Sequence, residues 1–301
     1  MKKFKPGIVI QGPLISTGRT PKTESIPIPN LTINDIVEFN CTNLLNQICK
    51  EYSSKFFIVI ATWKTEDQIL IQKIKKLNSD KVKIVLLDDI TPKISPLKAI
   101  VPGNNKYRQI YSTLKGAEKL EELGCSHVIK LRTDMRLDVL MLWDEFIKIK
   151  KKRNLKVLVP SLSLSSPSQI PDLYMVTETK ILIDFFRKLI QTKPWFFSIH
   201  YEIFYRWLNT EKKISRIFIK IFEGTKVLNN LYLYAWSNFF APASLNVFLS
   251  IIWRGEKYEY EKIRKRIFTE DLENHLKLYK NPFKLKSFSD KLLNKLFKYK
   301  I

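Results

Sequence analysis

The stretch "SHVIKLRTDMRLD", residues 126–138, joins a short apolar run to a cluster of charged side chains. His127 to Leu131 has the length and the β-branched content of a buried strand. The charged residues that follow are Arg132, Asp134, Arg136 and Asp138. Burying such charges is unfavourable unless they are paired or bind a ligand. The stretch therefore predicts either an internal ion pair or a binding site at the end of a strand.

Similar apolar runs precede this stretch, and segments with helical spacing separate them. The apolar runs are Gly7 to Ile10, Lys55 to Ala61 and Lys81 to Leu87. The segments with helical spacing are 32–52, 66–78 and 105–123, and residues 14–30 have the composition of an extended loop. Strands that alternate with helices predict an α/β fold with a mainly parallel sheet flanked by helices.

Polar residues stand directly after each predicted strand. They are Gln11-Gly12-Pro13, Thr62-Trp63, Asp88-Asp89 and Arg132-Thr133-Asp134. The carboxyl ends of parallel strands meet at one edge of a sheet, where ligands bind in open α/β folds. Asp134 is the best candidate for a metal ligand, because Mg²⁺ takes oxygen ligands from one or two carboxylates and from substrate phosphates. Arg108, Arg132 or Arg136 would supply positive charge.

Composition and missing motifs narrow the class of protein. Lys and Arg number 52 against 29 for Asp and Glu, a net charge of +23 that indicates an anionic partner. The 3 cysteines form no CxxC pair, which predicts a reducing, cytoplasmic setting. The sequence has no GxxxxGK, GxGxxG, HExxH or GxSxG motif, so the usual signals of P-loop, dinucleotide-binding, zinc and serine-hydrolase enzymes are missing. Carboxylates at strand ends in a basic chain suit a nucleotide-sugar transferase.

Four segments, in this order, resemble the WavE family, whose proteins are associated with building the lipopolysaccharide core and other surface polysaccharides. They are "GIVIQGPL" (7–14), "IVIATWK" (58–64), "NKYRQIYSTLKGAEKL" (105–120) and "VIKLRTDMRL" (128–137). The most specific element is Arg108-Gln109 with Ser112-Thr113 and Gly116. The resemblance covers about residues 7–205. It implies a glycosyltransferase with a GT-A-like, Rossmann-like fold.

The resemblance also implies roles for single residues in binding the donor. Gln11 and Gly12 would lie beside the nucleotide, and Arg108 and Gln109 would contact the donor or orient the segment that carries Asp134. GT-A enzymes usually hold a divalent metal, Mg or Mn, with Asp-x-Asp. This sequence has Thr133-Asp134-Met135, so a single strand-end carboxylate takes that place.

Two later acids resemble the positions that face the acceptor in this fold. They are Asp172 in "IPDLYMV" and Glu202 in "HYEIFYRW". If the reaction inverts the anomeric carbon, one of them would deprotonate the acceptor hydroxyl. The sequence does not choose between the two.

We therefore expect transfer of a sugar from a nucleotide sugar to a cell-surface glycan, lipopolysaccharide or capsule, which can be lipid-linked. Two alternatives stay open: a GT-A-like pseudoenzyme without the full Asp-x-Asp, and a basic nucleic-acid-binding protein. Against nucleic acid as a partner, no helix-turn-helix or RNA-binding signature is present.

The C-terminal part differs in character from the rest. We predict a catalytic domain over 1–213 and a mainly helical, basic appendage over 214–301. Residues 227–253 carry no charge, but their asparagines and Pro242 favour a buried or interfacial segment over a membrane span. Residues 283–301 pair an apolar face with a lysine-bearing one, which predicts peripheral docking on an anionic membrane surface.

Overall fold

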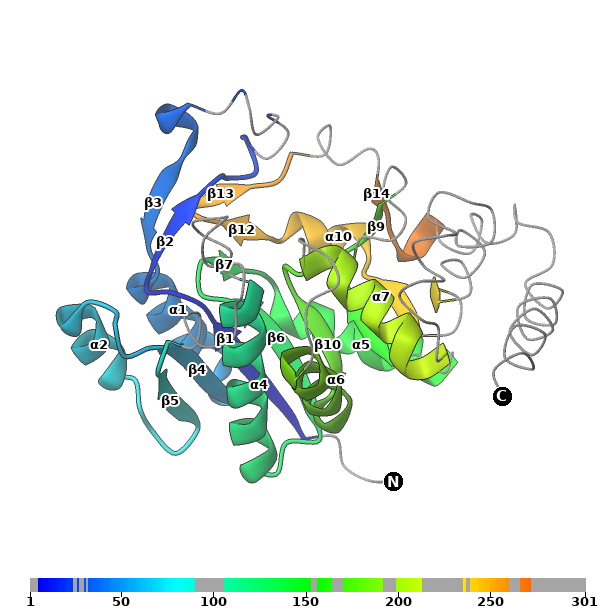
Figure 1. Ribbon diagram of the computed structural model, residues 1–301, viewed down its shortest axis with the longest axis horizontal. Helices are drawn as coiled ribbons and strands as arrows, with labels where there is room; N and C mark the ends of the chain where they lie inside the picture. Colours follow the sequence, from blue (N-terminus) through cyan, green and yellow to red (C-terminus); the bar gives the residue numbers. More distant parts are fainter. Residues whose placement is uncertain are drawn as a thin grey trace, which may run out of the picture.

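The protein is described by a computed structural model. It places residues 5–23, 26, 30, 32–89, 106–152, 156–163, 170–191, 199–212, 235–236, 239–259 and 266–271. Within these residues the main sheet has seven strands, in the order β11-β8-β10-β6-β1-β4-β5 (Figure 1). Their bounds are β1 Pro6–Gln11, β4 Phe57–Trp63, β5 Val82–Leu87, β6 His127–Arg132, β8 Val157–Val159, β10 Met175–Glu178 and β11 Phe240–Pro242.

The sheet is mainly parallel, which confirms the predicted α/β, Rossmann-like fold class. β1 pairs in parallel with β4 and β6, β4 with β5, and β8 with β11. Only β10 among the described strands of this sheet runs antiparallel to its neighbours, β6 and β8. The continuous apolar runs predicted from the sequence form the four parallel strands at its centre and one edge.

The strand order places a topological switch point between β1 and β6. The chain moves outward from β1 to β4 and β5, then returns to form β6 on the other side of β1. Gln11 at the end of β1 is level with Arg132 at the end of β6. In open α/β sheets such a switch point opens a crevice beyond the strand ends, where ligands bind.

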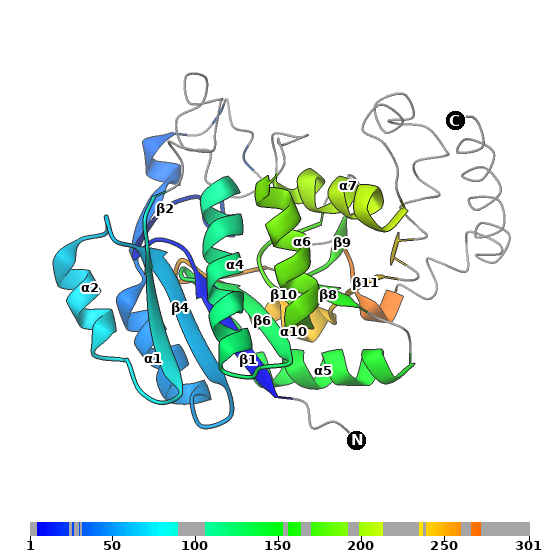
Figure 2. The ribbon, with the colours of Figure 1, turned by 60° about the horizontal axis from the view of Figure 1, so that its bottom comes forward.

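Helices cover both faces of this sheet, as its alternating side chains require. The helices are α1 Thr42–Tyr52, α2 Gln68–Lys75, α4 Lys106–Glu122, α5 Val139–Lys152, α6 Thr179–Gln191, α7 Ile199–Lys212 and α10 Leu245–Leu249. Ile8 and Ile10 of β1 pack with α1, α2, α5 and α10 on one face. Val9 packs with α4, α6 and α7 on the other, where Figure 2 shows α4 and α6 side by side.

Short strands in the described residues form three smaller sheets, and the two that contain β2 and β7 lie beside the carboxyl ends of β1 and β6 (Figure 1). β2 Ile15–Gly18 pairs with β3 Val37–Asn40, and a 3₁₀ turn, Ile33–Asp35, lies between them. β12 Ile252–Trp253 pairs with β7 Met135–Arg136 and with β13 Glu256–Lys257. β9 Leu162–Ser163 pairs with β14 Arg266–Ile267.

The predicted helix over 32–52 is wrong in its first part, because α1 begins only at Thr42. The preceding residues form β3, where Val37 and Phe39 alternate with more exposed neighbours. The side-chain oxygen of Asn40 accepts hydrogen bonds from Thr42 N (3.0 Å) and Thr42 Oγ1 (2.8 Å), which marks the change from strand to helix. The predicted loop over 14–30 likewise contains β2.

The C-terminal part is less helical than predicted where it is described. Residues 239–259 and 266–271 hold β11, β12, β13 and β14 besides α10, and β11 joins the main sheet beside β8. Within 227–253, Trp236 and Phe248 are buried in the core. No helix in the described ranges is both long and apolar enough to cross a membrane. The segment 283–301 lies outside the described residues, and the division at residue 213 stays a prediction.

Candidate functional site

Helix α4 brings its first turns to the carboxyl end of β1. Gly116 permits this, since a Cβ there would lie 2.1 Å from Val9 Cγ2. One turn earlier, the Ser112 hydroxyl lies 3.0 Å from Gln11 Oε1, within hydrogen-bond distance. The element formed by Arg108-Gln109, Ser112-Thr113 and Gly116 thus lies on one helix that packs on β1, and it places Arg108 and Gln109 at the strand end.

A cleft of about 240 Å³ opens at the switch point. Its wall consists of residues 11–13 and 15–17, Trp63, Arg108 and Gln109 of α4, residues 132–134, and Arg254. Among the described residues of that wall Asp134 is the only acid, whereas Arg108, Arg132 and Arg254 are basic. The cleft is therefore suited to an anion.

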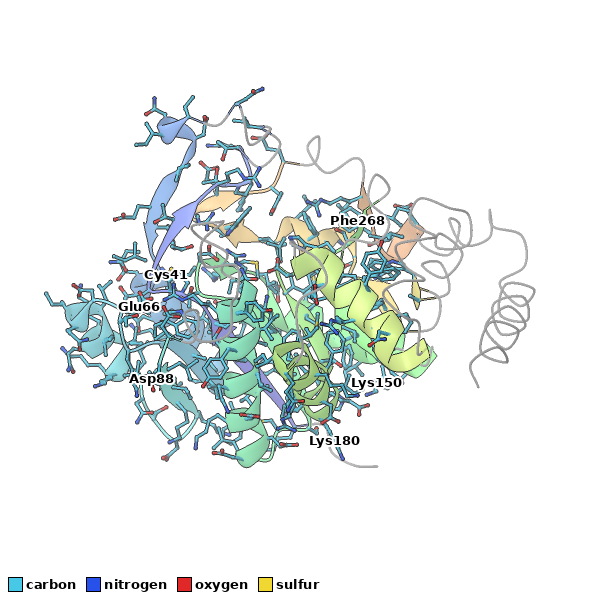
Figure 3. The ribbon with its side chains drawn as sticks, viewed as in Figure 1. Cys41, Glu66, Asp88, Lys150, Lys180 and Phe268 are labelled. Carbon is cyan, nitrogen blue, oxygen red and sulfur yellow. The ribbon has the colours of Figure 1, made fainter. Side chains whose placement is uncertain are left out.

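Gly12 allows the ends of β1 and β6 to approach each other. Its φ is 136°, a left-handed value that favours glycine, and a Cβ would lie 2.6 Å from Thr133 Oγ1. Thr133 Oγ1 donates to Pro13 O at 2.7 Å, and Thr133 N donates to Gln11 O at 3.1 Å. Glu66, labelled in Figure 3, accepts from Leu14 N at 2.9 Å and anchors the same segment.

Asp134 is 1% exposed and is surrounded by donors. Arg132 binds it with two nitrogens, Nε to Oδ1 at 3.0 Å and Nη2 to Oδ2 at 3.1 Å. Oδ2 also accepts from Ser16 Oγ at 2.7 Å and Trp253 Nε1 at 3.2 Å, and lies 3.1 Å from Arg254 Nη2. Burial alone would raise the pKa of the Asp134 carboxyl, but the two guanidiniums outweigh it and hold that pKa well below its usual range.

Arg254 reaches this cluster from a tight turn between β12 and β13. Its φ is 49°, the only positive φ among the described non-glycine residues. Its backbone N–H donates to Asp134 O at 2.9 Å, and its guanidinium donates to Ser16 Oγ and to the carbonyl oxygen of Arg19. A Cβ on Gly18 would lie 2.8 Å from Arg254 Nη1, so glycine makes room for this side chain.

Several polar atoms at the cleft have no protein partner among the described residues. Arg132 uses Nε and Nη2 for Asp134, while Nη1 has no such bond. Arg108 pairs with Asp89 through Nη2 at 3.0 Å and lies 4.8 Å above the Trp63 ring, but its buried Nε has no acceptor. The buried Gln109 Oε1 has no donor. Arg108 Nε and Gln109 Oε1 are thus buried without a described partner, whereas the part-exposed Arg132 keeps donors for a ligand in the cleft.

Most of the predicted donor-binding residues meet at this cleft. Those in its wall are Gln11, Gly12, Arg108, Gln109, Arg132 and Asp134. Asp89 is joined to it through Arg108, and Thr62 is buried with an unpaired hydroxyl but lies outside the wall. Asp88, labelled in Figure 3, pairs instead with the exposed Lys64 at 2.9 Å.

Sequence reasoning missed the residues that complete the Asp134 cluster. Ser16, Trp253 and Arg254 come from β2 and the β12–β13 turn, far from Asp134 in the chain. A tight turn is visible in Arg254-Gly255, but nothing in the sequence links that turn to Asp134. Arg136, a predicted source of positive charge, pairs with Glu51 at 2.8 Å instead.

Asp172, one of the two predicted catalytic acids, is buried outside the cleft wall. Its backbone oxygen accepts from Lys130 Nζ, and its Oδ1 lies 3.7 Å from His200 Nδ1. Burial raises the pKa of Asp172, but His200, Lys130 and Arg132 together lower it below its usual value. Burial also lowers the pKa of Lys130 to about 8.

Glu202, the other predicted acid, lies in the first turn of α7 and is 2% exposed. Its Oε1 accepts from Arg206 Nε at 2.9 Å, one helical turn later. It also faces Tyr107 of α4, whose pKa is raised to about 12 by burial and by the Glu202 charge. Catalytic roles for Asp172 and Glu202 stay predictions.

The donor set around Asp134 does not fit the divalent metal of GT-A enzymes. In the described ranges no three His, Cys, Asp or Glu side chains gather as metal ligands. Oδ2 of Asp134 already has four donors, and a cation on Oδ1 would lie beside the Arg132 guanidinium that binds the same atom. Two positive charges therefore already occupy the surroundings of this carboxylate.

Comparison with known proteins gives structural likeness only. No family description matches the sequence, and no curated protein matches it either. A cytidylyltransferase from Leptospira borgpetersenii aligns over 92% of this chain and 95% of its own, with 16% identity and a TM-score of 0.42. The 4-diphosphocytidyl-2C-methyl-D-erythritol synthase of Anaerococcus prevotii aligns over 64% and 77%, with 10% identity and a TM-score of 0.35.

A third solved structure, HddC from Yersinia pseudotuberculosis, aligns over 60% of this chain and 80% of its own, with 15% identity and a TM-score of 0.32. Likeness at this level carries no argument about substrate or activity. None of the three comparisons supports the WavE family specifically.

Proposed function

We propose that this chain is a glycosyltransferase that binds the diphosphate of a nucleotide-sugar donor in the cleft between β1 and β6. The observation that carries this proposal is a cleft at the switch point whose described wall has three arginines, Arg108, Arg132 and Arg254, and a single acid. Guanidiniums bind phosphate oxygens through charge-assisted hydrogen bonds, and a diphosphate supplies several such oxygens.

The chemistry of sugar transfer suits this arrangement. As the bond from the sugar to the nucleotide breaks, negative charge develops on the departing diphosphate. Donors that are already fixed in place stabilise that charge without reorganising. Arg132 is fixed by Asp134, and Arg108 is fixed between Asp89 and the ring of Trp63. One side chain, Asp172 or Glu202, would then accept the proton of the acceptor hydroxyl.

The acceptor we propose is a cell-surface glycan, in lipopolysaccharide or capsule. The four segments that resemble the WavE family support this part of the proposal. The net charge of +23 also suits an acceptor carried on an anionic membrane surface.

Calorimetric titration with a panel of nucleotides and nucleotide sugars tests the proposal. We expect one nucleotide class to bind wild-type protein and Arg108→Ala to weaken it by about 10- to 100-fold, since a hydrogen bond to a charged group contributes about 1.5–3 kcal/mol. Arg108→Lys should also bind weakly, because an ammonium replaces a planar fork.

Arg187→Ala is the matched control, since Arg187 is an exposed arginine on α6 that pairs with Glu118. It should bind like wild type. Binding of oligonucleotides alone, abolished by salt, would favour the nucleic-acid alternative. Nucleotide-sugar binding without transfer to any glycan acceptor would favour the pseudoenzyme.

A further inference from the structure

We propose that this site neutralises the donor diphosphate with its own guanidiniums and works without a divalent cation. Arg132, held by Asp134 and backed by Arg254, takes the place of the metal, and Asp134 is a positioning residue rather than a metal ligand. This inference rests on the proposed function of the same cleft and concerns how the negative charge of the donor diphosphate is neutralised there.

Protein donors already surround both carboxylate oxygens of Asp134. Two carboxylate oxygens offer about four lone-pair positions. Five protein donors surround them here, four at Oδ2 and one at Oδ1. A magnesium ion requires near-ideal octahedral geometry at short distances, so it would have to displace Arg132 from Oδ1 or approach its guanidinium closely.

The charges of Arg132, Arg254 and Asp134 do not cancel. Arg132 and Arg254 share the single carboxylate of Asp134, which leaves one net positive charge at the buried wall of the cleft. Arginine stays protonated at any pH at which proteins fold, so this charge is permanent. A metal ion would be repelled by that charge, whereas a phosphate would be attracted.

Asp134 uses only some of the N–H donors of Arg132. Because Asp134 takes one N–H each from Nε and Nη2 of Arg132, both N–H groups of Nη1 and the second N–H of Nη2 are left for a ligand. Arg132 itself lines the cleft and its side chain is 18% exposed. Asp134 therefore determines which edge of the guanidinium faces the cleft.

The backbone of Arg254 has a left-handed conformation. A left-handed conformation at a non-glycine residue is unfavourable and is kept where the surroundings require it. Here it lets the Arg254 backbone donate to Asp134 O while the side chain reaches Asp134 Oδ2 and Ser16 Oγ. The second guanidinium is thus placed by the fold at a conformational cost, which supports a role beyond packing.

Calorimetric titration of the full chain with inorganic pyrophosphate and with UDP, CDP and GDP, in excess EDTA and again in Mn²⁺ or Mg²⁺, tests the inference. We expect the Kd of the bound diphosphates to change less than about threefold between the two conditions, well under the tenfold change that 1.4 kcal/mol produces. A Kd that falls by more than about tenfold when the metal is added would overturn the inference.

Variants distinguish a positioning residue from a metal ligand. In EDTA, Asp134→Asn should raise the Kd for pyrophosphate by about tenfold or more, because the loss of a fixed orientation for Arg132 outweighs the added net positive charge, and Mn²⁺ should not restore it. Arg132→Lys, which keeps the charge, should bind about as weakly. If Asp134→Asn instead binds normally in EDTA and loses only a response to Mn²⁺, Asp134 is a metal ligand.

Arg136→Lys is the control, because Arg136 follows closely in the chain and pairs with Glu51 outside the cleft wall. It should bind pyrophosphate like wild type. Circular dichroism identifies variants that fail to fold. If Asp134→Asn is among them, Arg132→Lys decides, and normal pyrophosphate binding by that variant in EDTA overturns the inference.

The two proposals fail in different ways. Diphosphates that bind only with metal overturn this inference and leave the proposed function standing. Pyrophosphate that binds in EDTA while no nucleotide binds overturns the proposed function and keeps a guanidinium anion site. Absence of binding by every probe overturns both.

Discussion

Two cations project from one face of β6, each beside an aspartate, and they differ in what they can do. Arg132 and Lys130 are two residues apart, so their side chains project from the same face of the strand. Arg132 binds Asp134 at the strand end, beside the cleft. Lys130 lies one step deeper and donates to the backbone of Asp172, which is close to His200.

The difference between the two clusters is whether their charge can change. Guanidinium and carboxylate hold the first cluster charged, because the pKa of Asp134 lies well below its usual range. The second cluster contains an amine, Lys130, whose pKa is lowered by burial to about 8. The fold thus places permanent charge at the cleft and titratable charge behind it.

The largest effect that tests this comparison comes from Asp134→Ala. Removing the carboxylate leaves Arg132 and Arg254 buried without their shared partner. We expect the free energy of unfolding to fall by about 3–5 kcal/mol, measured by urea denaturation. Asp172→Ala should lower it less, because Lys130 keeps the backbone oxygen of residue 172 as its acceptor. Equal losses in the two variants would contradict the ranking.

The next effect is a contribution of Lys130 to the pH dependence of stability. Burial lowers its pKa from 10.5 to about 8, so between these values the unfolded chain binds a proton that the folded chain lacks. Stability should therefore rise with pH across that window, by up to about 3 kcal/mol from this residue.

Urea denaturation of wild type and Lys130→Met between pH 8 and 10.5 measures this dependence. The variant should lose the Lys130 part of the rise. Lys119→Met, on the exposed side of α4, is the control and should keep the full slope of stability against pH. Arg132→Lys is unsuitable as a control, because it places a new amine near Lys130. A slope that is the same in wild type and Lys130→Met would show that both clusters have fixed charge.

A smaller effect is expected from Gly18→Ala. The new Cβ would lie 2.8 Å from Arg254 Nη1 and would force that guanidinium to shift. Overpacking of this kind lowers the free energy of unfolding by about 1–3 kcal/mol. Residue 18 also has a φ of 153°, which a side chain strains, so part of the loss belongs to the backbone. In a double-mutant cycle with Arg254→Ala only the overpacking part should disappear, and a loss unchanged by Arg254→Ala would show that the effect belongs to the backbone of residue 18 alone.

The smallest effect is expected from Arg136→Ala, which breaks a partly exposed ion pair with Glu51. Such pairs contribute less than about 1 kcal/mol, so the urea midpoint should hardly move. A loss as large as that of Asp134→Ala would mean that removing any charge near β7 destabilises the fold. The Asp134 cluster would then not differ from an ordinary surface ion pair.

The centre of the fold could be predicted from the sequence because its strands are continuous apolar runs. β1, β4, β5 and β6 each combine such a run with polar residues at the carboxyl end. The edge strands could not, since β8 and β11 have three residues each and β11 lies within a long apolar stretch without periodicity. The β2–β3 hairpin was hidden by Ile36 and Phe39, whose spacing also fits a helix.

Some residues of the candidate site could likewise be predicted from the sequence, and others could not. Gln11, Arg108 and Arg132 follow or face strand ends, so local sequence placed them at the cleft, as the structure does. Ser16 and Arg254 have no local signal, because their position depends on pairing between β12 and β7 and on the course of β2. Residues that act by tertiary charge pairing are visible only once the chain is folded.

The contact between Arg254 and Ser16 joins residues that are 238 positions apart. A contact of such long range forms late, because closing a long loop costs conformational entropy before the contact repays it. During synthesis the centre of the sheet leaves the ribosome well before the β12–β13 turn, and chains fold from their N-terminal side as they emerge. A nascent chain that ends before residue 254 therefore carries the sheet but only one of the two guanidiniums that balance Asp134, so its binding site matures after its core.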